Sequence, residues 1–498
     1  MTQSLTYPGV YIQEISSSDH TIIGVTTAIT AFIGWAPKGS ISKAEAISSW
    51  SEYSRLYGGL DSRSYLGYAV NQYFENGGQQ AYIVRLVDPT TATSASVTIA
   101  GMTVTASAPG SWLNGYRINI QTIANDAQRF NLHVYGAGIN APLLSSYANL
   151  SLQATDAQYV STVIANSADI IQVTVNNASN APVAGDYLLA NGSDGSVLNP
   201  GSAQFHAALA GDGVNTGLYL LTKVDLFNLL VVPGESDPVT VNTLQAFAKQ
   251  NTAFLITSSA STDTYANLSQ NASPDSRLTG DNACNAAYYF PWINAPDPLQ
   301  QNNLRAFPPC GFVAGIYAQI DSNNGVWKAP AGVNASIRGS SSLLETLNDQ
   351  EQGVLNNKAI NCLRNFPSYG MVIWGARTLQ GSSSQSSEWE YIPVRRTALF
   401  IEASVKRGLQ WVVFEINAEP LWAQIRLSIS TFLETLFQQG AFQGQTPQQA
   451  YFVKCDQTTT SQTDINQGLV NIVIGFAPLK PAEFIVINLQ QIALKPAP

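Results

Sequence analysis

Residues 227–234 read FNLLVVPG, a continuous apolar run with a turn behind it. Asp237 and Pro238 then open a segment with apolar side chains at helical spacing, and residues 253–256 form a second apolar run. A strand, a helix and a strand in this order make a βαβ unit. Because such units place helices on both faces of a parallel sheet, the stretch predicts an α/β fold.

The chain before this unit contains two stretches that differ in composition and residue pattern. Residues 27–36 and 81–87 are predicted as strands and residues 50–57 and 66–74 as helices, which together make a compact α/β block. From about residue 90 to 205, Thr, Ser, Ala, Val and Asn dominate, and short strand-like runs alternate with Gly-rich turns. We expect this second stretch to be a β-rich insertion of its own.

The last third of the chain holds two more long helices, and residues 419–439 give the stronger pattern. One apolar stripe runs along this segment, made of Trp422, Ile425, Ile429, Phe432, Leu433 and Leu436. Gly440 ends the helix, and the runs at residues 451–454 and 469–476 predict two strands.

Both ends of the chain carry a strand-like segment with no partner nearby in the sequence. Val10 and Ile12 share one face of an alternating run, and residues 16–19 (SSSD) read as a polar tether. Unpaired strand N–H and C=O groups recruit a sheet edge, which belongs either to the same chain or to a neighbour. The residues of the two arms are Tyr7, Pro8, Gly9, Val10, Tyr11, Ile12, Phe484, Ile485, Val486 and Ile487.

Composition limits the classes of function. Charged residues make up 11% of the 498 residues, against about 25% in typical soluble domains. This scarcity favours a surface that meets other protein, although a neutral polar surface is the alternative. Net charge is −9 with no basic run, so we expect no nucleic-acid partner. The sequence contains no apolar run long enough to span a membrane, so we expect no membrane insertion. It also lacks a signal-peptide pattern, so we expect synthesis in the cytoplasm without export.

Residues that carry chemistry are few and scattered. His20, His133 and His206 share no metal-ligand spacing, and the sequence contains no phosphate-binding GxxxxGK[ST] motif. The four cysteines lie far apart, mostly in apolar runs, and are predicted to be reduced core residues: Cys284, Cys310, Cys362 and Cys455. We therefore expect no catalytic, cofactor-binding or metal-binding residues.

Several motifs, in order and with plausible spacing, resemble contractile tail sheath proteins. They are YPGVY at residues 7–11, FIGWAPKG at 32–39, YGGL at 57–60, LGYAV at 66–70, NGG at 76–78, GVWKAPAG at 325–332, QWVVFE at 410–415, EPLW at 419–422, GAFQG at 440–444, FVKCD at 452–456 and PAEF at 481–484. The resemblance covers roughly residues 5–90 and 220–490. The insertion carries none of it, and sheath families vary there.

The resemblance implies an α/β, or α+β, multidomain organisation. Its parts are an N-terminal strand arm and tether (1–22), an α/β segment that joins the core (23–89), a variable β-rich outer insertion (90–205), a subtilisin-like α/β domain without a catalytic triad (206–378), an inner α/β domain (379–480) and a C-terminal strand arm (481–498).

The resemblance also implies a structural function. Sheath subunits form a helical homopolymer of hexameric rings around an inner tube, and their arms add strands to the sheets of neighbours. The assembled sheath shortens and widens, and this repacking drives the tube through a target envelope without nucleotide hydrolysis. Other implied partners are baseplate and tail-terminator proteins, and the implied location is the tail of a phage or phage-like particle made in a bacterial cytoplasm. The inner domain would face the tube, with Glu434, Gln438 and Gln439 as the more exposed candidates.

Two other functions compete with a sheath. A subtilisin-like domain suggests a hydrolase, but subtilisins place Asp, His and Ser in that order, and no histidine follows His206. A capsid or host-attachment protein would share the low charge and the β-rich insertion, but it has no reason to carry two arms. The sequence leaves open whether the particle is a phage tail, an extracellular injection system or a type VI-like apparatus.

Overall fold

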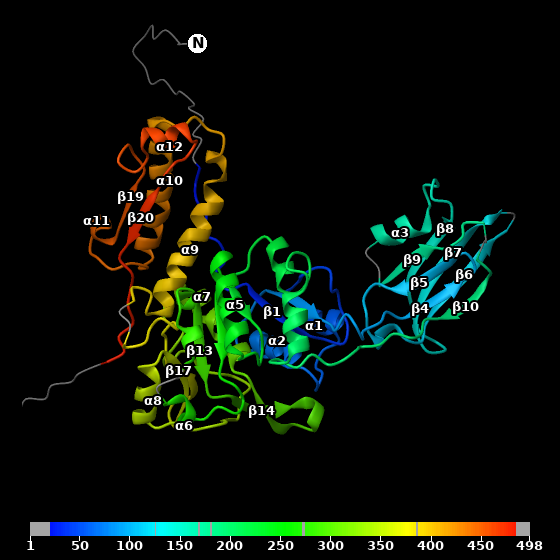
Figure 1. Cartoon of the computed structure of the whole chain (residues 1–498), viewed down its shortest axis with the longest axis horizontal. Helices are drawn as coiled ribbons and strands as arrows, with labels where there is room; N and C mark the ends of the chain where they lie inside the picture. Colours follow the sequence, from blue (N-terminus) through cyan, green and yellow to red (C-terminus); the bar gives the residue numbers. More distant parts are fainter. Residues whose placement is uncertain are drawn as a thin grey trace, which may run out of the picture. The chain divides into compact units, whose positions relative to one another are not determined.

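The computed structural model describes residues 20–124, 126–167, 170–179, 182–270, 274–384 and 387–484. These residues divide into two compact units, each of which is described by itself (Figure 1). Within the described residues, the larger unit comprises Thr26–Leu399 and residues 480–484, and the smaller unit comprises residues 20–25 and Phe400–Leu479.

An eight-stranded sheet forms the centre of the larger unit. Its strand order is β18-β17-β13-β12-β11-β1-β3-β2. The six inner strands run parallel, whereas the two edge strands are antiparallel to their neighbours. The strands are β1 (Thr30–Trp35), β2 (Glu45–Ile47), β3 (Ala81–Leu86), β11 (Leu229–Val231), β12 (Phe254–Ser258), β13 (Ala286–Phe290), β17 (Ile360–Phe366) and β18 (Gly370–Ile373).

Helices cover both faces of this sheet, as the predicted βαβ unit requires. Phe32 and Ile33 are neighbours on β1, yet they belong to different buried clusters, one on each face. The first cluster includes residues of α2 (Leu66–Glu75) and α7 (Cys310–Asn324), and the second includes residues of α5 (Pro238–Gln250). The remaining helices of this unit are α1 (Trp50–Tyr57), α4 (Ala203–Ala210), α6 (Tyr265–Leu268), α8 (Asp349–Asn356) and the first part of α9 (Ile392–Gly408).

The predicted βαβ stretch is confirmed, with a shorter first strand. Asp237 accepts a hydrogen bond from the Thr240 amide and thereby caps α5, whose first residue is Pro238. Only three of the eight residues quoted above lie in β11. The strand begins after Asn228, whose side chain accepts a hydrogen bond from the Ile29 amide.

The β-rich stretch folds around a buried cluster of its own. One sheet has the order β10-β6-β7-β8 and the other β4-β5-β9. Their elements are β4 (Ser96–Ile99), β5 (Met102–Ala106), β6 (Tyr116–Ile123), β7 (Asp126–Ala137), β8 (Leu143–Ser151), α3 (Val160–Asn166), β9 (Ile171–Val175) and β10 (Gly185–Leu188). Thr93 and Ser193 form an antiparallel bridge where the chain enters and leaves this β-rich part. Leu198 and Phe205 pack instead in the core of the large sheet, so the module comprises residues 93–193. We call these residues the outer module, after the position that the resemblance implies.

The smaller unit combines long helices with a two-stranded sheet. The sheet pairs β19 (Tyr451–Lys454) with β20 (Val473–Phe476), and the helices are the end of α9, α10 (Glu419–Gln438), α11 (Pro447–Ala450) and α12 (Gln462–Asn466). All six residues of the predicted apolar stripe on α10 are buried. The second predicted strand is shorter than expected, because residues 469–472 lie outside β20.

A small three-stranded sheet completes the β-sheets of the described residues. It joins β14 (Ile293–Asp297), β15 (Asn303–Phe307) and β16 (Ser342–Leu343). Within the described ranges, no helix combines the length and the apolar character that crossing a membrane requires.

Candidate inter-subunit surfaces

The two-stranded sheet of the smaller unit rests on α10 by one face. The Tyr451 hydroxyl donates a hydrogen bond of 2.9 Å to the Glu434 carboxylate. Burial, followed by the hydrogen bond to Glu434 and the charge of that carboxylate, raises the pKa of Tyr451 to about 12. On the other face, the Phe452 ring crosses Gly475 so closely that a Cβ there would lie 2.2 Å from a ring carbon. Gly475 therefore has to lack a side chain for the two strands to pair.

The same sheet offers edges for further strands. In the described part of the chain it contains two strands, β19 and β20, so each has one paired edge and one edge without a strand. An isolated pair of strands is marginally stable, and its outer N–H and C=O groups are a template for another strand. The smaller unit thus has the geometry of a strand acceptor.

The predicted tube-facing residues lie at the C-terminal end of α10. Gln438 and Gln439 are exposed. Glu434 is only half-buried and already engaged, because it accepts hydrogen bonds from Tyr451 and from the Gln438 amide at 3.1 Å. Of the three residues, the two glutamines are freer to meet a partner.

The N-terminal residues of the described chain run along α9. The Ile22 side chain lies against Gly408, the Val25 amide donates to the Ser404 hydroxyl at 3.1 Å, and His20 stacks on Trp411 with ring centroids 3.8 Å apart. The chain is therefore held on the smaller unit up to His20. The predicted arm residues Tyr7, Pro8, Gly9, Val10, Tyr11 and Ile12 lie outside the described residues.

An ion pair holds the start of the C-terminal segment on the larger unit. Arg377 donates to both carboxylate oxygens of Glu483, at 3.0 and 2.5 Å, and the two side chains are 5% and 14% exposed. The next residue, Phe484, is 77% exposed and lies in no strand. Ile485, Val486 and Ile487 lie outside the described residues.

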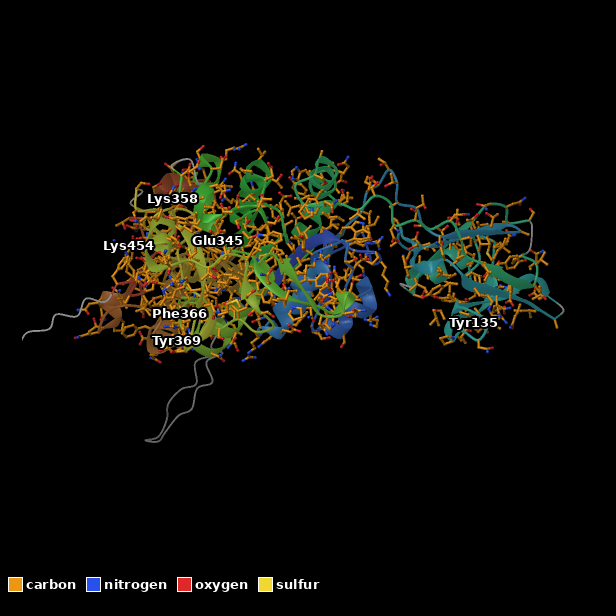
Figure 2. All side chains as sticks on the ribbon, turned by 90° about the horizontal axis from the view of Figure 1, so that it is seen from below. Tyr135, Glu345, Lys358, Phe366, Tyr369 and Lys454 are labelled. Carbon is orange, nitrogen blue, oxygen red and sulfur yellow. The ribbon has the colours of Figure 1, made fainter. Side chains whose placement is uncertain are left out.

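A groove of about 520 Å³ lies beside residues 481–484. Its lining includes Trp374, Glu483 and Phe484. Trp374 also packs on Phe366, with ring centroids 4.7 Å apart, and Phe366 and Tyr369 lie together at the β17–β18 hairpin (Figure 2). Glu483 and Phe484 thus lie beside an aromatic surface.

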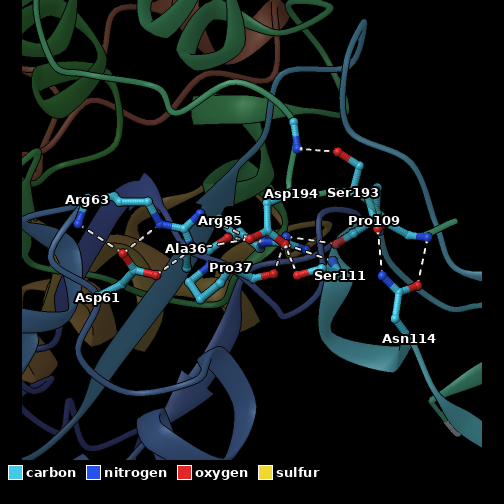
Figure 3. A network of polar contacts seen from close by, with 12 residues as sticks. Ala36, Pro37, Asp61, Arg63, Arg85, Pro109, Ser111, Asn114, Ser193 and Asp194 are labelled. Atoms are coloured by element: carbon cyan, nitrogen blue, oxygen red, sulfur yellow. Dashed lines mark hydrogen bonds and ion pairs between the residues drawn. The ribbon is translucent and has the colours of Figure 1, made fainter. Parts of the chain in front are cut away.

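A buried arginine ties the base of the outer module to the large sheet. Arg85 on β3 is 2% exposed and donates to the carbonyls of Ala36, Pro37, Gly39 and Pro109 at 2.7–3.0 Å (Figure 3). Burial lowers the pKa of Arg85 to about 10. Because Pro109 belongs to the module and the other three residues follow β1, a single side chain joins the two parts.

A second cluster in the same junction is ionic. Arg63 donates to Asp61 and to Asp194, and Asp194 also accepts from the amide and hydroxyl of Ser111 at 2.8 Å (Figure 3). Burial by itself raises the pKa of Asp194, but the hydrogen bonds from Ser111 and Arg63 outweigh it and hold that pKa below its usual range. The sequence did not single out either cluster, because its members come from separate segments.

The side chains of His133 and His206 form hydrogen bonds, and the cysteine side chains are buried. His206 lies 3.0 Å from the buried Glu235 carboxylate, which also accepts the amides of Gly201 and Asp237, and His133 bonds to Ser146. All four cysteines are free and buried, as predicted. Among the described residues, no group of three or more His, Cys, Asp or Glu side chains has the geometry of a metal site.

Two families of sheath domains match the chain. The phage tail sheath protein central domain matches residues 207–379, and the phage tail sheath C-terminal domain matches residues 384–492. Together these matches cover more than half of the 498 residues. The chain belongs to the phage tail sheath family.

Individual relatives agree with this assignment. The tail sheath protein of Vibrio phage KVP40 is 27% identical over 185 residues, which are 37% of this chain but only 26% of that relative. The PVC sheath complex, an extracellular contractile injection system solved in the contracted state, is 25% identical with a TM-score of 0.61 over 98% of this chain and 99% of that one. A chain of the anti-feeding prophage baseplate shares the fold at 23% identity and a TM-score of 0.59, over 98% of this chain and 100% of that one.

Proposed function

We propose that this sheath-family chain polymerises around an inner tube and contracts by subunit repacking, which drives the tube through a target envelope. The observation that carries the proposal is the likeness to the PVC sheath in its contracted state, which extends over 98% of the chain. The mixed α/β fold, with its several sheets, is the fold of such sheath structures.

The arms provide the connection between subunits in this proposal. Tyr7–Ile12 and the residues that follow Glu483 add strands to β19–β20 edges of neighbouring copies, in a helical homopolymer of hexameric rings. The unpaired edges of the two-stranded sheet support this arrangement, because main-chain ladders give adhesion without demanding particular side chains. Val10 and Ile12 would fix the register of the added strand.

The domains take radial positions in the same proposal. The C-terminal inner domain faces the tube through the end of α10, the subtilisin-like domain without a triad occupies the middle, and the outer module lies at the surface. The partners are the tube, baseplate and tail-terminator proteins of a phage or phage-like particle. The baseplate association rests on the likeness to the anti-feeding prophage chain.

The chain performs no catalysis in this account. Its relatives are sheath proteins, and the His206 ring is engaged by Glu235 beside the start of α5. Contraction then draws its free energy from the repacking of subunits assembled in a metastable extended state.

Negative-stain electron microscopy of the purified protein tests the proposal. We expect hollow, striated tubes of uniform diameter. Dispersed particles at every protein concentration, combined with turnover of peptide or ester substrates, would favour the rival hydrolase.

A further inference from the structure

A strained turn precedes α10 in the smaller unit. The Glu415 amide donates to the Val412 carbonyl at 3.1 Å, which closes a four-residue turn. Val413 has φ −65° and ψ 127°, and Phe414 has φ +73°. These angles are those of a type II turn, whose third position requires positive φ and favours glycine. A phenylalanine there is strained, and such strain concentrates at functional positions.

The strained residue is also fully exposed. Phe414 is 103% exposed, and its neighbours Val413 and Ile416 are 63% and 84% exposed. Asn417 fixes the end of the turn, since it accepts from the Trp422 indole and donates to the Leu469 carbonyl, both at 2.9 Å. Single exposed apolar residues are ordinary, but three within four positions on a fixed turn mark an interaction surface. We call residues 412–416 the Phe414 turn.

The described chain begins next to this turn. The contacts of Ile22 with Gly408 and of His20 with Trp411 bring the chain along α9 to the residue just before Val412. Only residues 16–19 separate the predicted arm strand from His20. A fully extended chain of this length spans at most about 18 Å between residues 15 and 20. Whatever sheet edge receives the arm therefore lies close to the Phe414 turn.

The tube is a poorer partner for this turn than a second copy. The turn precedes the first residue of α10, Glu419, whereas the proposed tube-facing Gln438 is the last residue of that helix. A helix of this length extends about 30 Å. The two surfaces thus lie at opposite ends of one rigid element.

We propose that the Phe414 turn docks on the neighbouring copy that receives the N-terminal arm. This inference rests on the proposed function and adds a side-chain contact to the main-chain pairing of the arm. The apolar side chains of the Phe414 turn are buried at the same contact between copies where the arm strand pairs. Docking of the turn and pairing of the arm therefore favour each other.

The substitution Phe414→Gly separates a docking role from a structural one. Glycine relieves the positive φ and removes the ring, so the thermal midpoint of the unassembled subunit should stay equal or rise. The yield of sheath tubes at limiting subunit concentration should fall by about tenfold or more, as for a central interface anchor. Ile416→Ser should act in the same direction. The control Ile139→Ser removes a residue that is 95% exposed on the outer module, and it should assemble as the wild type does.

A photocrosslinking residue at position 414, in particles co-produced with their tube protein, identifies the partner. Dimers of this chain in assembled sheaths support the proposal. Adducts with the tube protein, or with the same chain's own residues 1–19, would overturn it, as would normal assembly of Phe414→Gly. If the wild-type protein forms no tubes at all, the proposed function itself fails, which is a different outcome.

Discussion

At the scale of single residues, a buried ion pair lies beside the start of the large sheet. Arg396 on α9 donates to both oxygens of Asp321 on α7, at 2.8 and 2.5 Å, and both side chains are 3% exposed. Arg396 also donates to the Thr27 carbonyl and lies over the Tyr317 ring. The pair ties two helices to the chain that enters β1.

Replacing Asp321 by Asn should destabilise the larger unit by about 3–5 kcal/mol, because it leaves a buried guanidinium without its counter-charge. The free energy of unfolding from urea titration of the unassembled subunit measures this loss. The double variant Asp321→Leu with Arg396→Met is the control, since an apolar pair of similar volume should recover most of the stability. Equal stability of the wild type and Asp321→Asn would show that the pair contributes little.

Some residue roles were open to sequence analysis and others were not. The α10 stripe follows from helical spacing alone, and its burial was predicted correctly. Arg85 sits in a strand whose sequence gives no hint that four carbonyls surround its guanidinium, because these carbonyls come from separate loops. The run WVVF at residues 411–414 is typical of a buried strand, whereas the turn closed by Glu415 exposes its last residue.

At the scale of elements, we predict that the stability of the junction between the outer module and the large sheet depends on pH. The pKa of Asp194 is depressed in the folded protein, so its contribution to stability is present above the ordinary Asp value of about 3.9 and is lost as the pH falls through the folded value. Two chain segments connect the outer module to the large sheet, one before residue 93 and one after residue 193. An acid-active protease should therefore cut these segments faster as the pH falls from about 5 to about 3. Rates are normalised to a denatured substrate at each pH.

The variant Asp194→Asn checks the cause of this pH dependence. It removes the titrating group, so the two segments should be cut faster than in the wild type at pH 5 and with a flatter response to acid. A pH profile identical to that of the wild type would assign the effect to another carboxylate.

The outer module itself should be dispensable for folding and assembly. Its buried cluster contains only residues of the module, while Leu198 and Phe205 belong to the large sheet. Replacing residues 93–193 by a short Gly-Ser linker should leave the remaining chain folded by circular dichroism and able to form tubes by electron microscopy. A deletion extended to residue 205 removes core side chains and should fail. Loss of folding in the shorter deletion would show that the module supports the core.

The elements of the fold were predictable to different degrees. The parallel centre follows from the apolar run at residues 227–234 and the helix that Asp237 caps. The partners of these strands did not follow, since β1 pairs with β11 across almost 200 residues of chain and an intervening module. Such long-range pairing depends on packing that a local pattern does not contain.

At the scale of the whole molecule, the arms decide whether subunits form a continuous mesh. Replacing Val10 and Ile12 by Asp should abolish polymerisation, because two charges would enter the pockets that fix the register of the added strand. The subunit should stay folded by circular dichroism, since the substitutions lie in the arm. Full-length contractile sheaths from this double variant would mean that the arm is an intrachain edge.

A cryo-electron microscopy map of the assembled particle, traced from residue 7 to residue 489, tests the proposed contacts between subunits. We expect residues 7–15 and 484–489 to pair with the β19–β20 sheets of neighbouring copies, the end of α10 to face the tube and the outer module to lie at the largest radius. A map in which both arms return to their own subunit, or in which the C-terminal domain lies at the outer radius, would contradict the proposed mechanism.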